Sequence, residues 1–332
     1  MVFVGMDLHR CRTQVAVLDD DGDVVMNRNM VNGSAEFTEL VAGLPSRTPV
    51  AVEAGYGWQW LADLLEGADL EMHLVHPAGC KAIAAARLKD DRVDARTLAH
   101  LLCSDLLPEA WVAPGEVRDL RRLLRHRAAL VRMRSSLKNR IHGILADHGV
   151  RVERNLWTGP GRQWLAAVEL PVVSRQVIEN SLQLIGHTDA LVTELRRGLA
   201  ETAEGDPRVE ALCQLPGIGP LTALTLLAEI GDISRFGSSR KLCAWAGLTP
   251  QVRNSDRRVR HGHITKQGSP WVRWVMVEAA HVAKHRPPFA EFYASCARRR
   301  GRNIATVAVA RKLLARCFHI LTEIHRDGPD AG

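Results

Sequence analysis

Short apolar runs and helical spacings alternate over the first 105 residues. Apolar runs predict strands over 2–8, 49–55 and 71–77, and residues 13–30 predict a β-hairpin that turns at Asp21-Gly22. Helical spacing follows over 34–44, which Ser34 opens, and over 60–68, and further helices are expected to begin near Pro77 and Asp91. A hairpin followed by strand–helix alternation favours an α/β unit, with a mixed sheet covered by helices.

The middle of the chain, from residue 116 to about 205, has no strand pattern. Leucine and isoleucine recur every seven positions at Leu123, Leu130, Leu137 and Ile144, which predicts a long helix. A second helical stretch is expected from about residue 174 to 203, after a loop at 158–161. This pattern fits an intramolecular helical hairpin or a dimerising coiled coil that lays arginines along nucleic acid, and four heptads do not separate the two.

The last third is predicted to be all-α. Gly217-Ile-Gly219 separates two apolar helical segments, which fits either a helix-hairpin-helix module or a plain tight turn between helices. A short helix over 238–247, a loop over 249–268 and helices over 269–285, 289–298 and 304–325 complete the chain. We therefore expect three domains, 1–110, 111–205 and 206–332.

Positive charge is concentrated in particular segments. The chain has a net charge of +7 and a pI near 9.3, and nine Lys or Arg residues lie between Arg118 and Arg140 against the single acid Asp119. Further basic clusters at 253–266 and 298–302 favour a polyanionic partner over a merely solvated face. The residues expected to contact nucleic acid are Arg121, Arg122, Arg125, Arg132, Lys138, Gly217, Gly219, Arg253, Arg257, Arg258 and Lys266.

Composition and cysteine usage favour a globular protein of the cytoplasm. Hydrophobic residues make up 46% and charged residues 24%, and no apolar run reaches the length that spans a membrane. Seven cysteines without a C-x-x-C pair argue against a disulfide framework or a zinc site and are expected to be reduced thiols.

Four carboxylates stand where a metal site would need them. Asp7 ends a predicted strand, Glu53 interrupts a second apolar strand, and Asp91 and Asp94 lie three apart at a helix start. Such oxygen donors could converge on Mg²⁺ and hold two ions for phosphoryl transfer. The alternatives are that Asp7 only ends a strand, Asp91 caps the helix and Asp94 favours its dipole, and Asp90 shares a face with Asp94.

Three motifs around these acids resemble a known family. GMDLH, VEAGYGW and KDDRVDARTLAHLL resemble the DEDD transposases of bacterial insertion sequences, whose N-terminal domain is similar to RuvC-type resolvases with an RNase H-like fold. The resemblance implies that the catalytic, metal-binding acids are Asp7, Glu53, Asp91 and Asp94. Its K-x-D-x-x-D-A pattern prefers Asp91 to Asp90.

The C-terminal segments resemble the transposase domain of the same family. They are LPGIGPLTALTLLAEIGDISRF, KLCAWAGLTPQVRNS and HGHITKQGSPWVR, and the resemblance implies that Ser255 is the nucleophile. Arginines at 253, 257, 258 and 260 would bind the scissile phosphate. The next residue is Asp256, where the family usually has glycine, and Thr265 and Ser269 are the other hydroxyls of this region.

The resemblance implies DNA recombination through a covalent phosphoserine intermediate, with Mg²⁺-bound acids in a composite site and a middle region that oligomerises. It also implies a bridge RNA that selects donor and target DNA. Two other hypotheses remain open. One is a DEDD nuclease that uses water and two metal ions without Ser255, and the other is a non-catalytic basic scaffold that binds nucleic acid.

Overall fold

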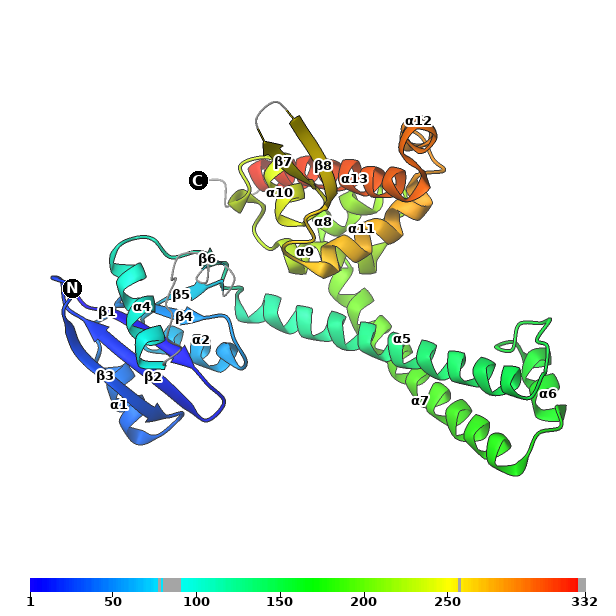
Figure 1. The fold of residues 1–332 in the computed structure, drawn as a ribbon, viewed down its shortest axis with the longest axis horizontal. Coiled ribbons are helices and arrows are strands. Elements are labelled where there is room, and N and C mark those ends of the chain that lie inside the picture. The colour runs from blue at the N-terminus through cyan, green and yellow to red at the C-terminus, as the bar shows by residue number, and fades with distance from the viewer. Residues whose placement is uncertain (77–78, 80–90, 256–257, 328–332) are drawn as a thin grey trace. The chain divides into compact units, whose positions relative to one another are not determined.

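The chain folds into two compact units, Met1–Gly115 and Glu116–Gly332 (Figure 1). The computed structural model describes residues 1–76, 79, 91–255 and 258–327. The helix expected near Pro77, and Asp90, lie outside these residues. Within the described ranges, no helix combines the length and the apolar character that a membrane crossing needs.

The first unit is a six-stranded mixed sheet with helices (Figure 1). The strand order is β3-β2-β1-β4-β5-β6, in which β1 pairs antiparallel with β2 and parallel with β4. This arrangement confirms the expected mixed α/β unit and is consistent with an RNase H-like domain. The elements are β1 (Phe3–Leu8), β2 (Arg12–Leu18), β3 (Val24–Val31), α1 (Ala35–Gly43), β4 (Pro49–Glu53), α2 (Trp58–Gly67), β5 (Glu71–Val75), α4 (Asp91–Cys103) and β6 (Glu109–Ala110).

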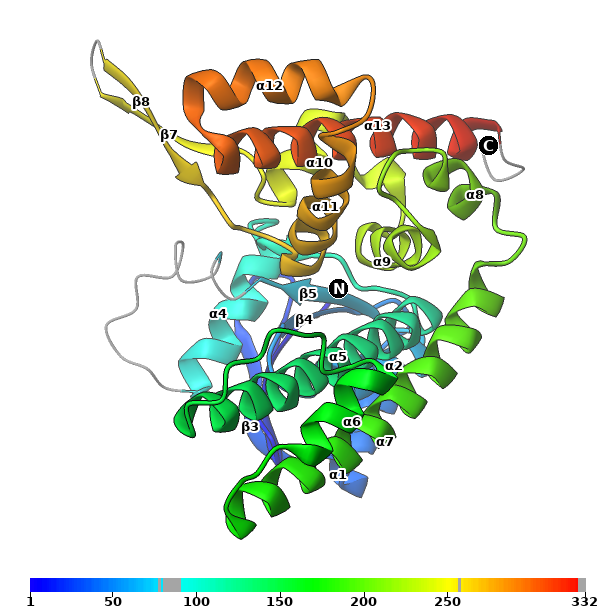
Figure 2. The same cartoon turned by 90° about the vertical axis from the view of Figure 1, so that its right-hand side faces the viewer.

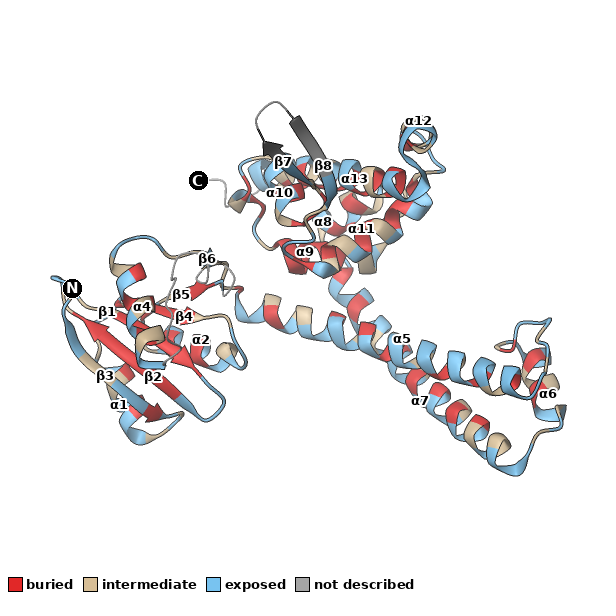
Figure 3. Ribbon diagram, viewed as in Figure 1, coloured by how far each residue is buried: buried red, intermediate tan, exposed pale blue. Residues whose placement is uncertain are grey.

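Alternation along β1 separates a face that packs on α1 and α2 from the opposite face, which packs on α4. Val4, Met6 and Leu8 are buried in one cluster with residues of α1 and α2, including Phe37 and Leu61. The intervening residues must point to the opposite face, because successive side chains of a strand alternate. Both faces of β1 are covered, and its residues from Val4 to Leu8 are all buried (Figure 3).

Helix α4 packs on that opposite face through a glycine. A Cβ added to Gly5 would lie 2.1 Å from the Ala95 carbonyl oxygen and 2.6 Å from the Ala99 nitrogen. Ala95 and Ala99 are fully buried and stand one helical turn apart. Only a strand residue without a side chain allows the helix backbone to approach β1 so closely.

The second unit begins with a helical hairpin. Helices α5 (Gly115–Asp147) and α7 (Val172–Ala203) share a buried cluster that includes Leu137, Ile141 and Ile178. Arg134 of α5 forms an ion pair with Asp189 of α7, with nitrogen and oxygen 2.7 Å apart. The intramolecular helix pair is therefore present, and a dimerising coiled coil stays a prediction.

The structure of the middle region differs from the sequence-based prediction in two details. The segment 158–161 was expected to be a loop, but Thr158 caps α6 (Gly159–Ala167) by accepting a hydrogen bond from the Gly161 N–H. Pro160 suits this first turn, where its missing N–H costs nothing. In the heptad series, Leu130 and Leu137 are buried but Leu123 is 46% exposed.

The rest of the second unit is a helical bundle around α13 (Figure 2). The Gly217–Ala279 contact ties the turn before α9 to α11, since a Cβ on Gly217 would lie 2.3 Å from the Ala279 carbonyl oxygen. The elements are α8 (Pro207–Cys213), α9 (Pro220–Ile230), the 3-10 turn η1 (Ile233–Arg235), α10 (Ser239–Trp245), α11 (Pro270–Ala283), α12 (Phe289–Arg300) and α13 (Arg302–Asp327).

The segment 249–268 is not a loop. It forms an antiparallel hairpin of β7 (Pro250–Ser255) and β8 (Arg258–Ile264). Close backbone contacts fix its base, where a Cβ on Gly268 would lie 1.8 Å from the Trp245 carbonyl oxygen. Polar or charged residues at most positions of the two strands hide the strand pattern, because a two-stranded ribbon outside the core does not need an apolar face.

Candidate functional site

The four acids expected to bind metal lie toward one edge of the sheet face that packs on α4. Asp7 lies in β1 and Glu53 is the last residue of β4. The parallel register pairs Met6 with Val52, so that the next residues, Asp7 and Glu53, are neighbours on the same face as Gly5. Asp7 is only 7% exposed.

Helix α4 brings the other two acids to this edge. Asp91, Ala95 and Ala99 follow each other at four-residue spacing and therefore share one side of the helix. Since Ala95 and Ala99 touch Gly5, Asp91 lies one turn further along the same side, toward the end of β1 that carries Asp7. Asp94 is in the same first turn.

One histidine nitrogen joins strand and helix. The Nε2 atom of His9 lies 3.2 Å from Asp7 Oδ2 and 3.4 Å from Asp91 Oδ2. The ligand atoms of these three residues all lie within 4.8 Å of one another. Asp7, His9 and Asp91 are thus close enough to bind a single cation.

The charges of the three other acids all act on Asp7. Burial is the largest cause of the raised pKa of Asp7, and His9 opposes it. The negative charges of Asp91, Asp94 and Glu53 raise the pKa of Asp7 further. Because like charges so close repel, a bound cation would relieve the repulsion.

The donor set suits a divalent cation. Carboxylate oxygens are the ligands that Mg²⁺ prefers, and two of these carboxylates lie on rigid strands. The imidazole of His9 is a ligand type better suited to transition metals. In its present position it can also share an N–H between Asp7 and Asp91.

A polar chain fixes the start of α4. Gln14, the cross-strand partner of Asp7, is buried, and its Nε2 donates to Asn27 Oδ1 at 2.6 Å. The Asn27 side-chain amide in turn donates to the Arg92 carbonyl oxygen at 3.1 Å. The first turn of the helix that carries Asp91 and Asp94 is therefore tied to β2 and β3.

His9 was not singled out among the sequence-predicted site residues. It stands in the GMDLH motif, two residues after Asp7, where the strand has ended and no periodicity marks it. The sequence did offer one signal for His9: histidine is a common metal ligand, and it stands two residues from the candidate ligand Asp7.

Ser255 belongs to the second unit. It is the last residue of β7 and pairs with Arg258, while Arg253 pairs with Arg260. Arg257 and Asp256 lie outside the described residues. The hairpin thus places a serine at the end of a ribbon whose backbone carries arginines on both strands.

Several arginines expected to bind nucleic acid contact the protein itself. Arg121 donates from Nε to the Ala228 carbonyl oxygen at 2.7 Å and from Nη2 to the Glu229 carbonyl oxygen at 3.1 Å. Arg125 forms an ion pair with the Glu229 carboxylate at 2.8 Å. These contacts join α5 to the C-terminal end of α9, where cations are favoured.

The other residues expected to contact nucleic acid lie in different local environments. Arg122 pairs with Asp119 on the exposed side of α5, and the Lys138 ammonium lies 4.5 Å from the centre of the Trp157 ring. Lys266 has a positive φ of 56° in the segment that follows β8. Gly219 caps α9, and a Cβ there would meet nothing within 4 Å, unlike one on Gly217.

The chain is similar to known transposases over most of its length. Residues 4–149 match a family of IS110-type DEDD proteins described as Transposase, and residues 209–294 match the family described as Transposase IS116/IS110/IS902 family. The transposase for insertion sequence element IS1111A of Coxiella burnetii is 26% identical over 98% of this chain and 91% of its own length. The transposase for insertion sequence element IS1328 of Yersinia enterocolitica is 23% identical over 97% of both chains. The first family match includes α5 and the second begins after α7, and the chain belongs to the IS110-type family of DEDD insertion-sequence transposases.

Proposed function

We propose that this transposase cuts and rejoins DNA during insertion-sequence movement, using Mg²⁺ held by Asp7, Glu53, Asp91 and Asp94. The observation that carries the proposal is the gathering of Asp7 and Asp91 around one nitrogen of His9. The three other acids all raise the pKa of Asp7. Acids that repel one another in this way are typical of functional sites, where a bound cation offsets their charge.

Each acid has a distinct part in this proposal. Asp7 and Glu53 are held by neighbouring parallel strands, and Asp91 and Asp94 are held by a helix packed on the same face. His9 positions the carboxylates of Asp7 and Asp91. When bound, Mg²⁺ offsets the negative charge that develops on the phosphate during its transfer.

We propose Ser255 as the nucleophile. Its Oγ attacks the phosphorus and gives up its proton, the phosphodiester bond breaks, and a DNA strand leaves as an alcohol. A hydroxyl of the partner strand then attacks the phosphoserine, which rejoins DNA and releases the serine. Arginines of the β7–β8 hairpin support this role by their charge. The acids and the serine would act in a composite site, which more than one subunit can supply.

We also propose that an RNA transcribed from the element selects donor and target DNA. The basic residues along α5 support contacts with a phosphate backbone. The sequence between Arg118 and Arg140 contains no Phe, Tyr or Trp, so recognition there would depend on backbone and shape.

The experiment compares products on DNA that carries the element's end. The transposase is incubated with guide RNA and Mg²⁺, and denaturing gels separate protein-bound from free DNA ends. The proposal predicts protein-bound ends with wild type, none with Ser255→Ala, and no cleavage with Asp7→Ala. Free ends that form equally with Ser255→Ala, but not with Asp7→Ala, would identify a nuclease that uses water.

A further inference from the structure

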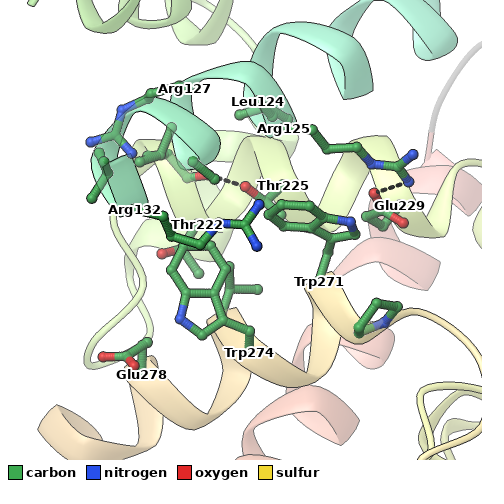
Figure 4. Close-up of a pocket in the computed structure, with 15 residues that line it drawn as sticks. Leu124, Arg125, Arg127, Arg132, Thr222, Thr225, Glu229, Trp271, Trp274 and Glu278 are labelled. Carbon is green, nitrogen blue, oxygen red and sulfur yellow. Dashed lines mark hydrogen bonds and ion pairs between the residues drawn. The ribbon is translucent and has the colours of Figure 1, made fainter. Parts of the chain in front are cut away.

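The second unit contains a cavity that the proposed chemistry does not use. Its volume is about 610 Å³, and it lies between α5, α9 and α11 (Figure 4). Its wall is mainly apolar, with Leu124, Ala128, Val131 and Leu221 among its residues. This volume is within the range of about 300–1,000 Å³ typical of small-molecule sites.

Two tryptophans of α11 project into this cavity (Figure 4). The Trp271 ring is already approached by two guanidinium groups, with the Arg125 carbon at 5.8 Å and the Arg132 carbon at 5.7 Å from the ring centre. The Trp274 ring lies 6.0 Å from that of Trp271 and remains 47% exposed. Trp274 therefore offers a flat apolar surface at the mouth of a cavity.

Cations outnumber the anions at this cavity. Arg125, Arg127 and Arg132 line it together with Glu229 and Glu278. Glu229 is buried and satisfied by the protein, since its Oε1 accepts from Arg125 and its Oε2 accepts from the Ser269 hydroxyl at 2.9 Å.

The positive charge continues along the helical hairpin. Burial lowers the pKa of Arg127, and repulsion from Arg196 and Arg134 lowers it further. Of these three arginines, Arg134 forms an ion pair with Asp189. Within the described part of the chain, the buried Nε of Arg127 has no hydrogen-bond acceptor. We call Arg127, Arg134 and Arg196 the arginine row. An anion beside it would offset the repulsion between these charges.

The exposed Trp274 ring at an apolar cavity and the arginines beside it together indicate the chemistry of the ligand. A planar apolar ring would stack on Trp274 and fill the apolar cavity, and an attached anion would face the arginine row. A nucleotide has both parts, and a base can reach an indole only when it is free of its duplex neighbours.

We propose that this cavity binds one unpaired base of a nucleic-acid strand, stacked on Trp274, with the flanking phosphates along Arg132, Arg127 and Arg134. The site deepens the proposed function, since such a strand belongs to the nucleic acid that a transposase handles. It is built from residues of the second unit and requires none of the four acids. Binding at the cavity can therefore be measured without cleavage.

The test uses the full chain in EDTA and a short oligonucleotide with one 2-aminopurine, whose fluorescence is quenched by stacking. Single-stranded DNA, single-stranded RNA and the matching duplex are compared by quenching and by anisotropy. Stacking contacts of this kind predict that Trp274→Ala weakens single-strand binding about 5- to 100-fold and removes the quenching. Trp274→Phe should keep most of both, and quenching by one strand type alone identifies the sugar that the site accepts.

Val282→Ala is the matched control, because Val282 is an exposed apolar residue of the same helix, two turns after Trp274. It should leave affinity unchanged, and thermal unfolding of each variant checks the fold. Unchanged single-strand affinity and quenching in folded Trp274→Ala would overturn the proposal. A changed oligomeric mass in that variant, with unchanged oligonucleotide affinity, would show instead that another copy of the chain covers the cavity. Asp7→Ala should lose cleavage and keep normal quenching. If it cleaved DNA, the proposed catalytic role of the acids would fail, and the base-binding proposal would be unaffected.

Discussion

Replacing Gly5 with alanine should separate the two halves of the acid cluster. The added Cβ would lie 2.1 Å from the Ala95 carbonyl oxygen, where ordinary contacts begin at 3.4 Å. Helix α4 must then recede by about 1.3 Å, the difference between these values. Because the obstructing atoms belong to the backbone, trimming the side chain of Ala95 or Ala99 cannot make room.

Both stability and activity should respond to Gly5→Ala. Overpacking of this kind costs about 1–3 kcal/mol of unfolding free energy. The shift also carries Asp91 and Asp94 away from Asp7, and a misplacement of about 1 Å at a reacting centre can slow catalysis about 100-fold. Urea unfolding measures the first effect, and Mg²⁺-dependent DNA cleavage measures the second.

Gly43→Ala is the matched control for Gly5→Ala. Gly43 ends α1, and a Cβ there would meet nothing within 4 Å, so that stability should be kept or slightly raised. If Gly5→Ala cleaved DNA at the wild-type rate with wild-type stability, the close approach of α4 would not be what forms the site.

Three further predictions follow from buried groups. Asp7→Asn should raise the melting temperature in EDTA at neutral pH, because it removes a buried charge among like charges; since the folded-state pKa of Asp7 is raised, this gain should fade as pH falls through that pKa toward 3.8. Glu229→Ala should cost about 1–3 kcal/mol in urea unfolding, because Arg125 and Ser269 lose their acceptor, whereas Glu323→Ala on the exposed side of α13 should cost little. Burial raises the pKa of Cys317 to about 12, so iodoacetamide at pH 8 should label the exposed Cys11 and spare Cys317 until the protein unfolds, as mass spectrometry of the peptides would show. A lower melting temperature for Asp7→Asn, a neutral Glu229→Ala or rapid labelling of folded Cys317 would each contradict the corresponding burial argument.

Local patterns were enough to predict the elements that hold the acids. The strands that end near Asp7 and Glu53 are apolar runs, and a helix does begin at Asp91. Their convergence was not predictable from these patterns, because it depends on the contact of Gly5 with Ala95 and Ala99. A glycine in a strand and two alanines in a helix carry no signal of being in contact.

Charge counting was less informative about individual arginines. Arg121 and Arg125 belong to the densest basic segment, yet they bind the backbone and side chain at the end of α9. The number of cations in a helix does not indicate which side packs against the protein. Likewise, the hairpin that contains Ser255 was expected to be a loop, since its polar and charged residues obscure strand alternation.

Mn²⁺ binding to the full chain tests the central claim most directly, namely that the carboxylates around Asp7 form a divalent-cation site. Electron paramagnetic resonance counts the bound ions in wild type, Asp7→Asn, Glu53→Gln and the control Glu66→Gln, which changes an exposed acid of α2. We expect Asp7→Asn and Glu53→Gln to lose bound Mn²⁺ and Glu66→Gln to bind as wild type does. Wild-type Mn²⁺ binding by folded Asp7→Asn would contradict the account.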